Sequence, residues 1–176
     1  MPKLLVFDIW GEYGHFRKPY TTTSPLTYSI PSRTVLTGII GAILGIEKGK
    51  NNIDLNYENC NLSLKILNPI KKVLINQNLI NTKIADMMSR IKPKGGRTQI
   101  RFETLKDVKY RIYVEIFKHE KHEKLKDILV NHKPVFSISL GISEHIANFE
   151  YIGEYEYLIQ NGNIEIDSVV NLEKIK

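Results

Sequence analysis

The order of apolar and polar residues predicts a chain of alternating strands and helices. The run KLLVFDIW at residues 3–10 is almost continuously apolar, which is typical of a strand buried on both faces. VKYRIYVEIF at 108–117 alternates between apolar and polar positions, as expected of a strand with one buried face. Three further segments have strand-like patterns: 61–75, which we expect to bend at Pro69, 134–141 and 147–159.

Two segments have the 3.6-residue period of helices. Ser32 is a suitable N-cap for a helix from about Arg33 to Leu44, and Gly45 is a suitable stop. Residues 119–132 predict a charged amphipathic helix, with Leu125, Ile128 and Leu129 as its apolar stripe. Residues 11–32 lack periodicity and read as a long loop, and loops of that length inside compact domains are usually functional or disordered.

A basic segment at 87–102 interrupts this order. Gly95-Gly96 lies between two short segments there, which predicts a hairpin turn and a projecting β-hairpin over about 85–105. Without the hairpin, the order is strand, helix, strand, strand, helix, strand. This order predicts an α+β fold with a ferredoxin-like (RRM-like) βαββαβ core and an inserted hairpin, all within one domain over 1–176.

Composition narrows the class of protein. The chain is 42% apolar and 25% charged, which is typical of a globular protein. Its single cysteine, Cys60, excludes an internal disulfide framework and a zinc site built on several cysteines. No apolar run approaches the roughly 18–20 residues of a membrane span, and the N-terminus does not resemble a signal peptide. We therefore expect a cytoplasmic protein that does not contact a membrane.

The positive charge is concentrated in one part of the chain. The net charge is +6; residues 83–111 hold nine Lys or Arg against three acids, and residues 144–176 hold two Lys against seven acids. The chain has 19 Lys and six Arg, so a lysine at any one place carries little information. Arg suits phosphates and base edges better than Lys does, and four of the six arginines lie within 90–111.

A first candidate site surrounds the start of the helix at 33–44. The free N–H groups of a helix N-terminus form a ready site for phosphate, and hydroxyls and cations near it would add contacts to a sugar-phosphate backbone. The candidate RNA-binding residues here are Arg17, Lys18, Tyr20, Tyr28, Ser32, Arg33 and Thr34.

A second candidate site is the basic hairpin. Alternation along a strand would place Arg97, Gln99 and Arg101 on one side, where they suit the exposed bases of a single strand. The simpler alternative is an edge hairpin that uses charge to avoid aggregation. The candidate residues are Arg90, Lys92, Lys94, Arg97, Gln99 and Arg101.

Small residues line one face of the predicted first helix. Gly38, Gly41, Ala42 and Gly45 lie at i, i+3, i+4 and i+7, and a face so smooth allows another backbone to approach closely. The approaching backbone would belong either to a ligand or to the protein itself, with the helix packed tightly on its own sheet.

Evidence for catalysis is thin. His119 and His122 are three residues apart on a charged helix, which is more typical of a solvated face than of a metal site. His15, with Tyr28 or Tyr13, would suit metal-free RNA cleavage by general acid–base chemistry, and His119 is a further candidate base. We predict no metal and no cofactor.

Two blocks of the sequence resemble the Cas5 family, the CRISPR-associated RAMP proteins that cap the crRNA 5′ end in type I Cascade complexes. The first block, residues 14–45, has the aromatic-basic pair Phe16-Arg17, a Tyr-x-x-Pro step at 28–31 and the glycine-rich helix. The second block, GRTQIRFETLKDVKYRIYV at 96–114, is similar to the family's return from its thumb hairpin into the core.

The resemblance implies a ferredoxin-like domain with a β-hairpin thumb that grips the 5′ handle of crRNA and contacts the Cascade backbone and large subunits. One branch of the family cleaves repeat RNA with a Tyr, Lys and His set; Tyr28 matches the Tyr, whereas Lys118-His119 follows a core strand instead of lying in the thumb. We therefore expect a non-catalytic RNA-binding subunit. The alternatives are a metal-independent endoribonuclease and a protein–protein adaptor.

Overall fold

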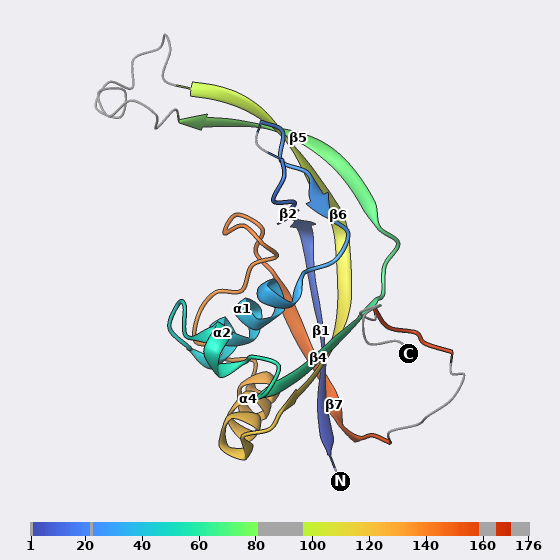
Figure 1. The fold of residues 1–176 in the computed structure, drawn as a ribbon. Helices are drawn as coiled ribbons and strands as arrows, with labels where there is room; N and C mark the ends of the chain where they lie inside the picture. Colours follow the sequence, from blue (N-terminus) through green and yellow to red (C-terminus); the bar gives the residue numbers. More distant parts are fainter. Residues whose placement is uncertain (1, 22, 81–96, 159–164, 170–176) are drawn as a thin grey trace.

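A computed structural model describes residues 2–21, 23–80, 97–158 and 165–169 of the chain. It contains these helices and strands, with the labels of Figure 1: β1 Lys3–Gly14, β2 Phe16–Arg17, β3 Thr27–Tyr28, α1 Arg33–Leu44, α2 Asn51–Asp54, β4 Cys60–Ile66, β5 Lys71–Ile80, β6 Arg97–Ile116, α4 His119–Asn131 and β7 Asn148–Glu156. No helix within the described ranges is long and apolar enough to cross a membrane.

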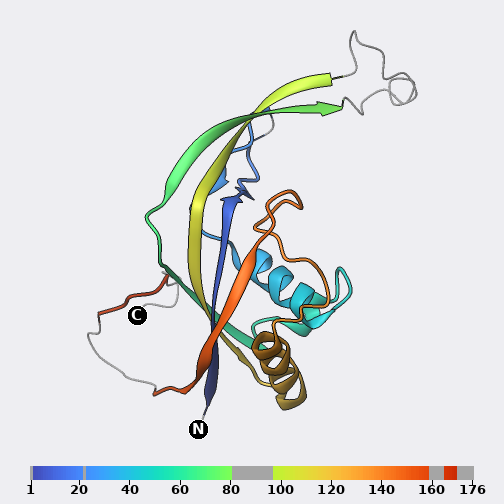
Figure 2. The same ribbon diagram turned by 180° about the vertical axis from the view of Figure 1, so that it is seen from behind.

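The fold is a mixed α/β arrangement built on an antiparallel sheet. The strands lie in the order β4-β6-β1-β7, and β5 pairs with the far part of β6. α1, α2 and α4 lie together on one side of this sheet in both views (Figures 1 and 2). The apolar side chains of α1 and α4 share one buried cluster with the strands, whereas α2 has no buried residue; Ile40 of α1, Leu125 of α4 and Phe7 of β1 are completely buried.

The predicted helix boundaries are confirmed for α1. Ser32 has an extended backbone and its hydroxyl accepts a hydrogen bond from the Val35 N–H, while Gly45 ends the helix in the left-handed conformation at φ 77°. The strand at 3–10 extends through Gly11 to Gly14, because Gly11 continues the ladder opposite Val108.

The prediction of a strand over 134–141 is wrong. The N–H groups of Val135 and Phe136 donate to the carbonyls of Ile43 and Ala42 at the end of α1, at 3.2 and 3.0 Å. Backbone groups used in this way cannot join a sheet ladder, and only an isolated bridge between Ser139 and Ile146 forms in this stretch.

β6 extends beyond the core as one strand of a long arm. Its far part, Arg97–Lys106, pairs with β5 over Lys71–Ile80 (Figure 1). The first strand of the arm, β5 at Lys71–Ile80, thus lies before the hairpin that the sequence predicted over about 85–105. The predicted turn at Gly95-Gly96 lies outside the described residues.

The glycine face of α1 packs against the protein's own chain. A Cβ built on Gly41 would lie 3.1 Å from the Cβ of Asn51 in α2, and one on Gly45 would lie 2.8 Å from a methyl group of Val135. Gly38 is different, since its nearest neighbour, the Asn51 amide nitrogen, would be 4.0 Å away. The close approach comes from α2 and the loop after α4, and it accounts for the smooth face without a ligand.

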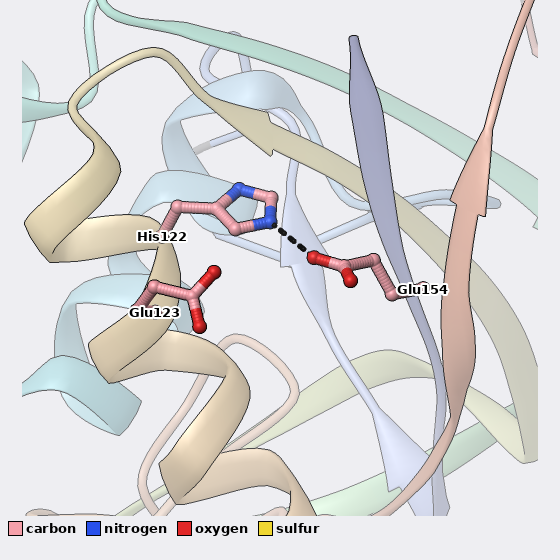
Figure 3. Close-up of side chains that lie close together, drawn as sticks. All are labelled: His122, Glu123 and Glu154. Atoms are coloured by element: carbon pink, nitrogen blue, oxygen red, sulfur yellow. Dashed lines mark hydrogen bonds and ion pairs between the residues drawn. The ribbon is translucent and has the colours of Figure 1, made fainter. Parts of the chain in front are cut away.

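A cluster of charges joins α4 to β7. Lys126 donates to Glu154 Oε2 at 2.9 Å, His122 Nε2 lies 3.1 Å from Glu154 Oε1, and Lys3 Nζ lies 3.4 Å from Oε2. Figure 3 shows the imidazole of His122 directed at the carboxylate. The hydrogen bond from Lys126, with those from His122 and Lys3, outweighs burial and lowers the pKa of Glu154 to about 2.

Alanine substitution at Gly38 and at Gly45 should have opposite effects on the stability of the protein. Gly38→Ala should raise the free energy of unfolding by about 0.5–1 kcal/mol, since an interior helical glycine is entropically costly and the added methyl makes only an ordinary van der Waals contact, with Asn51 at 4.0 Å. Gly45→Ala should lower it by about 1–2 kcal/mol, because a side chain is strained in the left-handed region. Urea denaturation measures both, and a gain in stability for Gly45→Ala would contradict the assigned helix end.

The Glu154 cluster predicts a pH-dependent stability. Because the folded pKa of about 2 lies below the ordinary value, the stabilisation is complete at neutral pH and is lost as the pH falls from about 4.5 toward 2. Glu154→Gln should lower the free energy of unfolding by about 1–2 kcal/mol at pH 7, and the difference from wild type should shrink by pH 3. Denaturant unfolding at pH 7 and at pH 3 measures the difference between the variant and wild type. The exposed Glu156→Gln variant is the control. An equal loss at both pH values would show that Glu154 acts through packing.

Candidate nucleic-acid interface

The loop that carries the first candidate residues is fastened to the base of the arm. The Glu103 N–H on β6 donates to the Pro25 carbonyl at 3.0 Å, and the Thr27 N–H donates to Glu103 Oε1 at 3.1 Å. Lys72 of β5 donates both to Glu103 Oε1 at 2.9 Å and to the Thr27 carbonyl at 3.1 Å. Glu103 and Lys72 therefore join the loop between β2 and β3 to both strands of the arm.

The electrostatics of Glu103 show that cations surround this junction. Burial of the carboxyl would raise its pKa, but the hydrogen bonds from Lys72 and the Thr27 N–H and the charges of Lys72 and Lys18 outweigh that effect and lower the pKa. Glu103 is thus a carboxylate at neutral pH that binds Lys72 directly and is attracted to the charge of Lys18.

The exposed part of the loop presents two tyrosines with a lysine between them. Lys18 Nζ lies 5.9 Å from the ring centre of Tyr20 and 5.5 Å from that of Tyr28, within the range of cation–π contacts. Tyr20 is 69% exposed and Tyr28 is 40% exposed. Arg17 is exposed and its Nη2 donates to the Thr21 carbonyl at 3.0 Å. These side chains offer rings and cations to solvent on one loop.

The arm presents a polar face to solvent. Arg97, Gln99 and Arg101 are all exposed and, as alternate residues of one strand, share a face. Across the ladder, Gln99 lies opposite Asn78 and Arg101 opposite Asn76, both exposed. Arg90, Lys92 and Lys94 lie outside the described residues.

The two candidate sites meet at Glu103. Arg101 precedes Glu103 by two residues on the same strand face, a separation of roughly 7 Å along the strand. Glu103 also accepts a hydrogen bond from Thr27, at the end of the loop. The face of the arm that carries Arg101 therefore begins next to this end of the loop. The bond from Thr27 to Glu103 thus joins two segments that are 76 residues apart in the sequence, and Figure 1 shows β2 beside the base of the arm.

The start of α1 follows directly from this loop. The Tyr110 hydroxyl donates to the Ser29 carbonyl at 2.7 Å, and its burial raises the pKa of Tyr110, so the phenol stays protonated and holds the chain before the helix. Ser32 is the N-cap, Thr34 is exposed, and the first turn carries no acidic residue. The positive end of the helix dipole is therefore left without a carboxylate from its own first turn.

Arg33 has a structural function that the sequence analysis missed. Its Nη2 donates to the carbonyls of Leu55, Asn56 and Cys60 at 3.3, 3.0 and 2.7 Å, and its guanidinium lies 4.0 Å from the ring centre of Tyr57. These bonds fix the chain between α2 and β4. They explain an arginine at this position without a ligand.

Arg111 likewise serves the protein itself. Its Nε and Nη2 donate to the two carboxylate oxygens of Asp8 at 2.7 and 3.1 Å, and Lys109 Nζ lies 3.6 Å from Asp8. Asp8 is buried in β1, so the pair neutralises a carboxylate within the sheet. The cluster of arginines in the sequence thus overstates the charge available to a ligand.

The candidate catalytic residues do not come together. His15 is 2% exposed, its Nδ1 lies 2.8 Å from the Glu103 carbonyl oxygen, and its Nε2 is buried without a partner. His119 is exposed at the start of α4, which lies at the opposite end of the sheet from β2 (Figure 1), and Tyr28 pairs with Phe16 of β2. A general base that can reach RNA next to Tyr28 is therefore not supplied by either histidine.

His122, Glu123 and Glu154 are close enough to raise the question of a metal site, since one ligand atom of each lies within 4.8 Å of the others. In Figure 3 a dashed line joins His122 to Glu154, and none joins Glu123 to either of them. Lys126 and Lys3 already neutralise Glu154, and two ammonium groups at a carboxylate oppose the binding of a cation. The geometry favours an ion-pair cluster that joins α4 to β7.

Sequence reasoning missed the residues that assemble this surface, namely Lys72, Asn76, Asn78 and Glu103. The expected strand segment over 61–75 includes only the start of β5, and KKVLINQNLI at 71–80 has runs of apolar and polar residues in place of the alternation that would have indicated a strand. Their neighbours on β6 depend on the register of the arm, which the sequence does not reveal.

Comparison with known proteins agrees with the resemblance of the two sequence blocks. The family model described as CRISPR-associated protein (Cas5) matches residues 4–170. No curated protein matches the chain.

Among solved structures, a chain of a CRISPR RNA-guided surveillance complex matches with TM-score 0.62 and 15% identity, over 81% of this chain and 59% of that one. A CRISPR-associated protein matches with TM-score 0.54 and 16% identity, over 87% of this chain and 69% of that one. A chain of the type III-B Cmr-beta complex bound to cognate target RNA and AMPPnP matches with TM-score 0.53 and 13% identity, over 93% of this chain and 66% of that one. At these identities the likeness concerns the fold alone.

The family match spans nearly all of the chain and includes both blocks that meet at Glu103. The chain belongs to the Cas5 family of CRISPR-associated proteins.

Proposed function

We propose that this protein is an RNA-binding structural subunit of a cytoplasmic CRISPR effector complex of the Cascade type, in which it grips the 5′ handle of crRNA. The arm and the β2–β3 loop would hold the RNA between them. The backbone and large subunits of the complex would be its protein partners. Family membership supports this role. Chains of solved CRISPR complexes that share the fold are consistent with it.

One observation carries the proposal: Glu103 and Lys72 fasten the loop to the arm, so that two basic segments form one exposed surface. The loop offers Arg17, Lys18 and two tyrosine rings, and the arm offers two arginines with amide side chains between them. Cations suit phosphates, rings suit unstacked bases and amides suit base edges, so this combination suits single-stranded RNA.

The strand order supports the ferredoxin-like assignment that belongs to this role. With β5 set aside as part of the arm, the order β4-β6-β1-β7 corresponds to second, third, first and fourth strands of a βαββαβ unit. α1 follows the first strand and α4 follows the third, as that unit requires. The arm then corresponds to the thumb inserted between the second and third strands.

Binding should depend on the arginines of the arm. The double variant Arg97→Ala/Arg101→Ala should bind crRNA with an intact handle at least tenfold more weakly, and the salt dependence should lose about one unit of slope for each phosphate contact removed. Both side chains are exposed, so the fold should be unaffected. Filter binding or fluorescence anisotropy at several salt concentrations would measure this.

The control variant is Lys118→Ala/Lys133→Ala, which removes the same charge from the ends of α4 and should bind like wild type. Equal losses for the two variants would mean that only net charge matters. A handle of scrambled sequence should bind more weakly than the intact one. The same samples, incubated with and without EDTA, should contain uncleaved RNA, and a discrete product in EDTA would instead favour the endoribonuclease.

A further inference from the structure

β6 changes partner where it leaves the core for the arm. β4 pairs with it as far as Tyr110, and β5 pairs with it from Lys106 onward. Four residues of the partner chain, 67–70, therefore lie opposite three of β6, 107–109, which makes a bulge in the ladder. A bulge bends a strand and increases its twist. In both views the arm curves toward the side of the sheet that carries the helices (Figures 1 and 2).

Asp107 lies in this junction with an unusual backbone conformation. Its φ is 52°, and among the described residues His132, at the end of α4, is the one other residue besides glycine with a positive φ. A side chain in the left-handed region is strained, although Asp and Asn tolerate it better than most residues. The Asp107 side chain is exposed, so its burial does not impose this conformation. Strain of this kind persists where the surrounding structure maintains it, and it concentrates at functional sites.

Asn68 connects the two strands across the bulge. Its side-chain amide donates to the Asp107 carbonyl at 2.9 Å, and the neighbouring Leu67 N–H donates to the Lys109 carbonyl at 2.9 Å. These two bonds satisfy backbone carbonyls at the point where the regular ladder is interrupted. The bond from Asn68 ends directly on the residue with the strained backbone.

Side-chain packing gives the junction little support on one side. A hollow of about 350 Å³ lies there, and its lining includes Asn68 and Asp107. Atoms beside a hollow lack neighbours on that side, so dispersion contacts there do not fix the bend. The bend on this side therefore depends on the backbone of Asp107 and on the bond that it accepts from Asn68.

The chain that carries Tyr28 into α1 crosses the same junction. The Thr27 N–H donates to Glu103, which lies on the arm side, and the Ser29 carbonyl accepts from the Tyr110 hydroxyl on the core side. Tyr28 thus lies between an attachment to the arm and an attachment to the core. A change in the bend would move these two attachments relative to each other.

We propose that Asp107 and Asn68 are positioning residues for RNA binding. They set the bend between the core and the arm, and so hold the arm, Tyr28 and the start of α1 in one binding geometry. Neither side chain needs to touch the RNA. The inference rests on the proposed function, and it assigns part of the affinity to two residues outside the basic surface.

The bend is measured as a distance between the arm and the core. Spin labels on Thr98→Cys and Lys118→Cys report this distance by pulsed electron paramagnetic resonance; both positions are exposed and the native Cys60 is buried. Asp107→Val should shift or broaden the distance distribution, because a β-branched residue fits the left-handed region poorly. Asn68→Ala should broaden it, and Asp107→Asn should reproduce wild type.

The affinity for crRNA with an intact handle should follow the bend. Asp107→Val should bind about tenfold more weakly, as expected where the competent geometry is populated about a tenth of the time. Asn68→Ala should bind about threefold more weakly for the same reason. Asp107→Asn should bind like wild type although it removes the same charge as the valine variant, which separates conformation from charge.

The matched control is Glu150→Val, which removes the same charge and adds the same side chain at an exposed position of β7. It should change neither the distance nor the affinity. If Asp107→Val and Asn68→Ala both keep the wild-type distance, the two residues do not set the bend and the inference fails. If the distance changes and the affinity does not, the inference fails and the proposed function stands. If wild type binds no handle RNA, both proposals fail.

Discussion

The twenty-residue strand β6 pairs with different strands along its length, and the rest of the fold depends on that pairing. Near its end it lies between β1 and β4, and toward its start it pairs with β5. β1 ends at Gly14, opposite Leu105, so β1 no longer covers this edge of β6 at Glu103, and the Glu103 N–H donates to the Pro25 carbonyl of the loop instead. Because buried backbone groups need partners, the end of β1 determines where the loop attaches and hence where its tyrosines meet the arm.

The charges of the protein divide into those that build it and those left for a partner. Arg33 holds three carbonyls and Arg111 neutralises buried Asp8, so neither cation is free to act only on a ligand. Arg97 and Arg101 stand exposed on the arm. A guanidinium with several donors can satisfy a set of carbonyls or a carboxylate inside a protein as readily as it can bind phosphate. Clustering of arginines in the sequence therefore indicates candidates for ligand binding. The burial and the hydrogen-bond partners of each arginine then distinguish the structural ones from those exposed to a ligand.

The parts of the fold that the sequence predicted well are those governed by local interactions. α1 begins after Ser32 and ends at Gly45 because a side-chain cap and a left-handed residue act within a few positions of the helix. The alternation at 108–117 predicted the core part of β6 for the same reason. The segment 134–141 has the composition of a strand, yet the end of α1 captures its N–H groups, and the glycine face of α1 contacts α2 and Val135.

By itself, the sequence determined the bounds of α1 and, to within one residue, of α4, most of the core strands, the basic character of the arm and the resemblance to one family. Only the tertiary structure decided that Arg33 is a structural residue, that the His15 side chain is buried, and that Glu103 joins the loop to the arm. Caps, periodicity and turn residues act over a few positions, so they are legible in a single chain. Hydrogen bonds such as that from Thr27 to Glu103 join residues 76 positions apart, and their partners follow from strand register and burial.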